Sequence, residues 1–157
     1  MTREDLDALY ARLDKRLPVR PEWREGTQAG TRRASLPVTL DGRQTGLTVA
    51  VTARLNDKNY LVINLIADRK CVARLCLNGF HRDRATRALI ASGHMHRWQD
   101  NRPTGSRIAK KPRLDAHTLL PATILTRDSA FDLFLTDCGI SPPPWRPMVW
   151  PADQVLL

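Results

Sequence analysis

Three histidines lie close together in the middle of the chain: His81, His94 and His96. Arginines surround them, and Arg97 directly follows His96. Histidine titrates near neutral pH, so one imidazole can remove the 2′-OH proton of RNA while another protonates the leaving oxygen. A guanidinium can stabilise the charge that develops on the phosphate. The pattern therefore indicates a candidate catalytic site for metal-independent RNA cleavage, made of His81, His94, His96 and Arg97.

The same region also fits a surface that binds phosphate without any reaction, and the residues alone leave both alternatives open. Residues 81–113 carry nine basic side chains against two acidic ones. Clustered cations attract polyanions, and nucleic acid is the commonest polyanion inside cells. Trp98 offers an indole on which an unpaired base can stack, which favours RNA or single-stranded DNA. The expected nucleic-acid contacts are Arg82, Arg84, Arg87, Trp98, Arg102, Arg107, Lys110, Lys111 and Arg113.

A metal site is a weaker alternative for the same histidines. Zinc sites usually include a carboxylate or carbonyl that supports the ligands, and they avoid nearby cations. Here arginines crowd the histidines, and Asp83 and Asp100 are the only acids in the region. We therefore expect no metal and no cofactor. The chain also lacks a P-loop, a dinucleotide fingerprint and a nucleophile elbow, which argues against nucleotide hydrolysis and esterase chemistry.

Length and composition are those of one basic globular domain. The chain has 157 residues and a formal net charge of +9. No apolar run reaches the roughly 18 residues that a membrane span needs, and the N-terminus lacks a signal-peptide pattern. We therefore expect a cytoplasmic protein without a membrane partner. Cys71, Cys76 and Cys138 have no metal-site or redox spacing, so we expect them to be reduced and mostly buried.

Periodicity predicts an α+β fold in which two helices pack on an antiparallel sheet. Leucines at helical spacing between Thr2 and Pro18 predict a first helix near residues 3–16. Between residues 34 and 78 the period changes to two, with short turns, which predicts a four-stranded meander. Apolar residues before Gly139 predict a last helix over 127–138. An extended stretch from Gly93 to Trp98 would place His94 and His96 on one face.

Residues 1–140 therefore form the expected domain, and residues 141–157 form a Pro/Trp-rich tail. The tail carries three consecutive prolines followed by Trp145, and then Trp150. Such a segment is typical of a strap packed on the domain. The alternative is a docking peptide that binds a protein partner through Trp145 and Trp150, which would fit a protein inhibitor acting by protein–protein docking.

Three short motifs resemble a small bacterial family of unknown function that is often carried on mobile elements. They are Asn78-Gly79-x-His81, His94-x-His96 and Phe134-Leu135-x-x-Cys138-x-Ile140. The resemblance spans roughly residues 74–140 and implies that the histidines share one site. It carries no established activity. Three functions stay open: nucleic-acid binding, for example in a mobile-element defence or counter-defence system; a small toxin-like ribonuclease; and an inhibitor.

Overall fold

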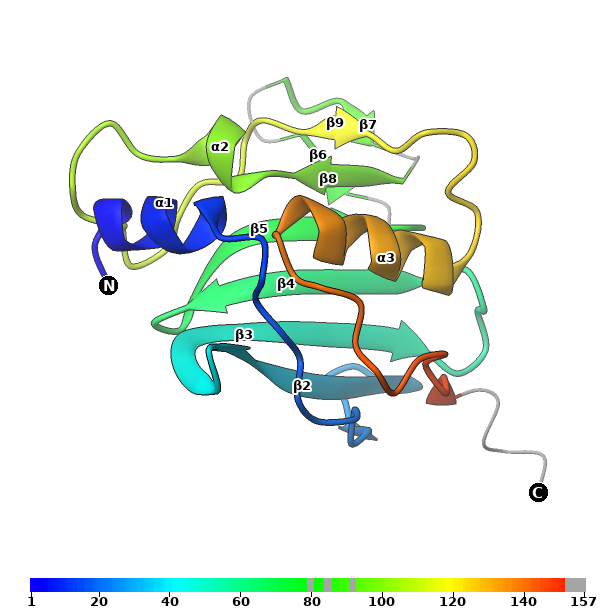
Figure 1. The fold of residues 1–157 in the computed structure, drawn as a ribbon. Coiled ribbons are helices and arrows are strands. Elements are labelled where there is room, and N and C mark those ends of the chain that lie inside the picture. The colour runs from blue at the N-terminus through cyan, green and yellow to red at the C-terminus, as the bar shows by residue number, and fades with distance from the viewer. Residues whose placement is uncertain (79–80, 84–85, 91–92, 152–157) are drawn as a thin grey trace.

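The computed structural model describes residues 1–78, 81–83, 86–90 and 93–151, without the side chain of His81 (Figure 1). Arg84 and residues 152–157 of the tail lie outside the described residues. The fold is α+β, as predicted, with a mostly antiparallel open sheet. Among the described residues, no helix is long and apolar enough to cross a membrane.

The four predicted strands are present, in the predicted antiparallel order. They are β2 (Thr31–Leu40), β3 (Arg43–Arg54), β4 (Leu61–Ala67) and β5 (Lys70–Cys76). Inward and outward side chains alternate along β4, so one face is buried in the core and the other is only partly covered.

The predicted number of strands is wrong, because the main sheet has seven among the residues that the structure describes. Its order is β1-β2-β3-β4-β5-β8-β9, with β1 (Arg24–Glu25) at one edge and β9 (Thr118–Leu119) at the other. β8 (His94–His96) pairs with β5. These strands have two or three residues each, too few for a period-two pattern to show. Beside the main sheet, β7 (Leu89–Ile90) pairs with β6 (His81–Arg82) in a separate two-stranded hairpin.

Two capped helices cover one face of the sheet. α1 (Arg3–Ala11) begins at Thr2, whose hydroxyl accepts from the Asp5 amide, and α3 (Arg127–Asp137) begins at Thr126 with the same type of capping box. Figure 1 shows both helices lying on the same side of the central strands. Phe131 and Phe134 of α3 are fully buried in the core.

The first helix ends earlier than predicted, and Lys15 explains where it stops. The Lys15 side chain is 0% exposed, and its ammonium donates to the carbonyl oxygens of Leu9 and Arg12. These carbonyls belong to the last turn of α1, where backbone oxygens lack helical partners. The chain then continues extended, and Leu13, which belonged to the predicted apolar stripe, is 76% exposed.

The described part of the tail packs against the body as a strap. Trp145 donates from Nε1 to the carbonyl of Leu17 at 3.1 Å, and Trp150 donates to Asp128 at 3.3 Å. Trp150 is only 5% exposed and lies edge-on to Phe131. The two indoles are therefore engaged with the domain itself.

Gly139 ends α3 in a position that admits no side chain. Its φ is +63°, and an added Cβ would collide with the carbonyl oxygen of Arg12 and approach Lys15 Nζ. Gly42 has a similar φ of +74° but open space around it. We expect Gly139→Ala to lower the free energy of unfolding by at least about 1 to 3 kcal/mol, and by clearly more than Gly42→Ala, which carries backbone strain alone. Urea unfolding of both variants measures this difference, and equal losses would contradict it.

Candidate functional site

The predicted convergence of His94 and His96 is confirmed. Both lie on β8, two residues apart, and their ring centroids are 5.1 Å from each other. A third imidazole joins them: the ring of His117 lies 5.8 Å from each of the other two. His117 immediately precedes β9, which pairs with β8, so the sheet edge brings it opposite His96. His94 and His96 are 0% and 4% exposed.

A hydrogen bond orients one of these rings, and an ion-pair contact with a carboxylate lies beside another. Nδ1 of His96 lies 3.0 Å from the carbonyl oxygen of Ala116. Because a carbonyl only accepts, Nδ1 carries the proton in the neutral ring and Nε2 holds the lone pair. Nδ1 of His117 lies 3.6 Å from Oδ2 of Asp83. The other carboxylate oxygen of Asp83 accepts from the amide and hydroxyl of Thr86, which holds it in the turn between β6 and β7.

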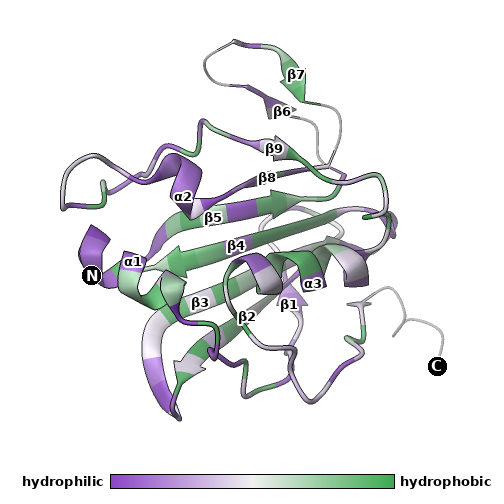
Figure 2. Cartoon of the chain, turned by 45° about the horizontal axis from the view of Figure 1, so that its top comes forward, coloured by the Kyte–Doolittle hydropathy of each residue, from purple (hydrophilic) through white to green (hydrophobic). Residues whose placement is uncertain are grey.

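A small cleft opens beside His96 on the sheet face that α1 and α3 do not cover. Its volume is about 210 Å³. Strands β5 and β8, the β6–β7 hairpin and the segment before His117 form its walls, and Figure 2 shows the hairpin projecting beyond this edge of the sheet. The lining residues are Cys71, Arg74, Arg82, Asp83, Ile90, His96, Pro112, Leu114 and Asp115.

Arg74 is the cation that the sheet itself places in this cleft. It is the direct cross-strand partner of His96, and directly paired residues project from the same face. Its Nε donates to Oδ1 of Asn64 at 2.8 Å, and Nη2 lies 3.9 Å from Sγ of Cys71. The guanidinium is thus held in place before any ligand arrives.

Arg97 lies on the opposite face from the histidines. It follows His96 by one residue, and alternation turns it toward α3. Its Nε donates to Oδ1 of Asp137 at 2.6 Å, and Nη1 donates to the hydroxyl of Thr118 at 3.3 Å. The structure therefore does not bring Arg97 to the predicted catalytic site, and it gives this side chain a role in joining α3 to the sheet edge.

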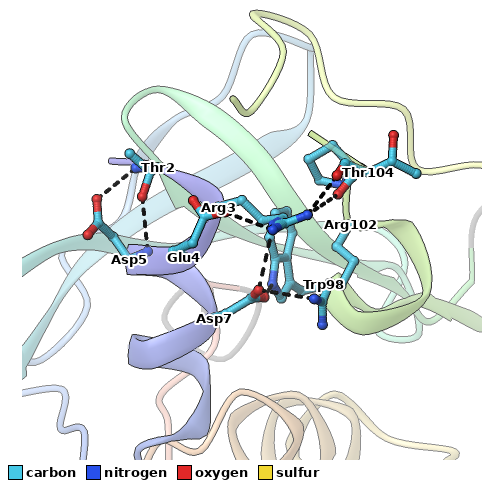
Figure 3. Close-up of polar contacts among 9 residues, drawn as sticks. Thr2, Arg3, Glu4, Asp5, Asp7, Trp98, Arg102 and Thr104 are labelled. Atoms are coloured by element: carbon cyan, nitrogen blue, oxygen red, sulfur yellow. Dashed lines mark hydrogen bonds and ion pairs between the residues drawn. The ribbon is translucent and has the colours of Figure 1, made fainter. Parts of the chain in front are cut away.

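Trp98 opens α2 (Trp98–Asn101) and points into the core. It is 2% exposed, and its Nε1 donates to Oδ1 of Asp7 at 2.7 Å. Figure 3 shows Asp7 also meeting Arg102, at 3.3 Å, and Arg3. A base at the surface has no access to a ring in this position, and the Arg102 guanidinium is already paired with a carboxylate.

The remaining predicted nucleic-acid contacts that the structure describes keep their side chains in solvent. Arg82 and Arg87 are exposed on the β6–β7 hairpin, and four further cations are exposed on the segment that leads to the cleft. None of these four forms an ion pair with another residue that the structure describes. They are Arg107, Lys110, Lys111 and Arg113.

Within the described part of the chain, no three His, Cys, Asp or Glu side chains are grouped so that they could hold a metal ion. His81 belongs to β6, but its side chain is outside the described residues, so its predicted place in the site stays a prediction.

The chain matches no protein-family model, no curated protein and no solved structure. The resemblance to a mobile-element family therefore stays a prediction that rests on its three short motifs.

Sequence reasoning missed His117 and Arg74. His117 is the only histidine outside the predicted constellation, and its distance along the chain hid its place beside His96. Arg74 lies between Ala73 and Leu75 of β5, and a charged residue inside such an apolar run is a signal that this face is not core.

Proposed function

We propose that this protein binds nucleic acid, RNA or single-stranded DNA, at the cleft and along the basic segment that leads into it. The proposal rests mainly on one observation: four exposed cations, without ion-pair partners among the described residues, lie on residues 107–113, a segment that reaches the cleft at Pro112, and Arg74 and Arg82 belong to the cleft lining. Unpaired cations are free to replace the counterions condensed on phosphate.

The size of the cleft favours a flexible strand. Its volume of about 210 Å³ suits one phosphate group and its neighbouring sugar rather than a duplex. A single strand can bend so that one phosphodiester enters while adjacent phosphates follow Arg107 and Lys110. Since Trp98 is buried, the affinity comes mainly from phosphate contacts, and we expect little sequence preference.

We expect a steep dependence of binding on salt concentration, and a flatter one after neutralising Lys110, Lys111 and Arg113 together. Each lost phosphate contact lowers the slope of log Kd against log salt by somewhat less than one, so the triple alanine variant should lose about two to three units. Fluorescence anisotropy with labelled single-stranded RNA and DNA, over a series of salt concentrations, measures the slope.

The control removes three equally exposed cations from other parts of the surface. Arg20, Arg43 and Lys58 lie outside the cleft and the basic segment. Their triple alanine variant has the same net charge as the test variant, and it should keep the slope of the unmodified protein. Equal slopes for the two variants, or no binding at low salt, would contradict the proposal.

The predicted inhibitor function finds less support. Its docking residues were Trp145 and Trp150, and both indoles donate hydrogen bonds into the domain.

A further inference from the structure

We propose that the cleft cleaves RNA, with His96 as the general base and His117 as the general acid. This proposal rests on the nucleic-acid binding proposed above and adds a reaction and a substrate class to it. The pair differs from the one expected from the sequence, because His117 takes the place of His81 and His94 as the partner of His96.

The separation of the two rings suits the two proton transfers. Their centroids lie 5.8 Å apart and the ring planes are tilted by 57°. One reacting phosphodiester presents its nucleophile and its leaving oxygen on opposite sides of phosphorus, so an acid and a base must flank it. The two imidazoles, one on β8 and one directly before β9, provide such a pair at this distance.

His96 has the tautomer that a base requires. Its Nδ1–H donates to the carbonyl of Ala116, so Nε2 carries the lone pair. The ring also lines the cleft. Nε2 can therefore take the proton from a ribose 2′-OH that enters the cleft.

His117 has the partner that an acid requires. The carboxylate of Asp83 lies beside its Nδ1, orients the ring and pairs with its protonated form, as the aspartate of a catalytic triad does for its histidine. The His117 side chain is 24% exposed, so solvent can restore its proton after each turnover. Asp83 itself lines the cleft and acts as a positioning residue.

Two arginines supply positive charge where the phosphate would sit. Arg74 is the cross-strand neighbour of His96, and Asn64 fixes its guanidinium. Arg82 approaches from the hairpin, where its Nη1 donates to the carbonyl of Arg87. Fixed donors aimed at a charged phosphorane stabilise the transition state more than the ground state.

The reaction is complete without a further reactant. The 2′-oxygen forms a bond to phosphorus as its proton passes to Nε2 of His96, and the bond from phosphorus to the 5′-oxygen breaks as His117 protonates that oxygen. The products are a 2′,3′-cyclic phosphate and a free 5′-hydroxyl. DNA lacks the 2′-hydroxyl, so it should be bound but not cut.

The first test incubates the purified protein with a labelled single-stranded RNA, with and without a chelator. We expect cleavage in both cases, with a cyclic phosphate on the 5′ fragment. In an RNA that carries one 2′-deoxy nucleotide, we expect no cleavage after that nucleotide. His96→Asn keeps an N–H that can donate to Ala116 but has no proton-accepting nitrogen. We expect it to cleave about 10²- to 10⁴-fold more slowly. Its Kd for the fully 2′-deoxy strand measures the effect on binding separately from the effect on cleavage.

The second test separates the acid from the base and also shows that the variant is folded. His117→Ala should lose a similar factor on ordinary RNA, but it should regain the wild-type rate on RNA whose leaving 5′-oxygen is replaced by sulfur, because a thiolate leaves without protonation. Asp83→Asn should show the same behaviour to a smaller degree. A merely structural defect would instead slow the cleavage of both the ordinary and the sulfur-substituted RNA. His96→Asn should stay slow on both.

The outcomes also separate the two proposals. Binding of RNA that remains intact would overturn the cleavage proposal and leave nucleic-acid binding in place, whereas failure to bind would overturn both. Cleavage that the chelator abolishes, or sulfur rescue of His96→Asn in place of His117→Ala, would overturn the assigned roles.

Discussion

Replacing Trp98 with alanine is expected to lower the free energy of unfolding by about 3 to 5 kcal/mol, the usual cost of removing a large buried aromatic ring. The indole is 2% exposed and belongs to the same core as Leu6 and Met95. The substitution also removes the donor that Trp98 Nε1 provides to Asp7. Urea or thermal unfolding, followed by circular dichroism, measures the loss.

Trp98→Phe is the matched control, because it keeps most of the buried ring and removes only the N–H. Asp7 retains Arg102 and Arg3 as ionic neighbours, so we expect a smaller cost of about 1 to 2 kcal/mol. If Trp98 instead contacts nucleic acid, both variants would keep nearly normal stability and Trp98→Ala would weaken binding to single strands. That result would contradict the placement of the ring in the core.

At about pH 10.5, the free energy of unfolding is expected to be lower by about 2 kcal/mol for each of two buried thiols. Burial raises the pKa of Cys76 from the ordinary 9.0 to about 11, and that of Cys138 to about 12. The unfolded chain therefore loses these protons first, and unfolding releases protons above pH 9. The stabilising contribution is complete below pH 9 and is lost as the pH rises through 11 and 12.

Two neighbouring groups modify this alkaline loss. Burial also raises the pKa of the Tyr10 hydroxyl, which adds to the loss. Burial lowers the pKa of the Lys15 ammonium, and this contribution has the opposite sign: stability rises with pH between that lowered pKa and the ordinary 10.5. The two thiols and the Tyr10 hydroxyl lower the stability as the pH rises, and only the Lys15 ammonium raises it. We therefore expect a net decrease in stability in alkali.

Cys138→Ala isolates the contribution of one thiol. Its absolute stability is lower because of the small cavity, but its loss between pH 8 and pH 10.5 should be smaller than that of the unmodified protein by about 2 kcal/mol. Urea unfolding at the two pH values provides the comparison. An identical pH dependence for the two proteins would show that Cys138 ionises normally in the folded state.

The local sequence pattern was sufficient to predict the elements that are long enough for an apolar spacing to repeat over several helical turns or several pairs of strand residues. The helices that became α1 and α3, and the strands from β2 to β5, follow from apolar residues at spacings of three to four or of two. Pattern also implied that His94 and His96 would share a face if this stretch were extended, and the rings do lie together. It could not reveal β1 or β9, or that His94–His96 pairs with β5 as β8, because these strands of two or three residues gain their stability from neighbouring strands.

The sequence by itself determined that the chain is a basic α+β domain, roughly where its long elements lie, and that two histidines share a face where the chain is extended. These properties depend on residues close together in the chain and on total charge. The tertiary structure alone decided that Arg97 binds α3, that Trp98 fills the core, and that His117 and Arg74 meet His96 at the cleft. Such contacts join distant segments, and they depend on how strands pair and how helices pack, which no local pattern contains.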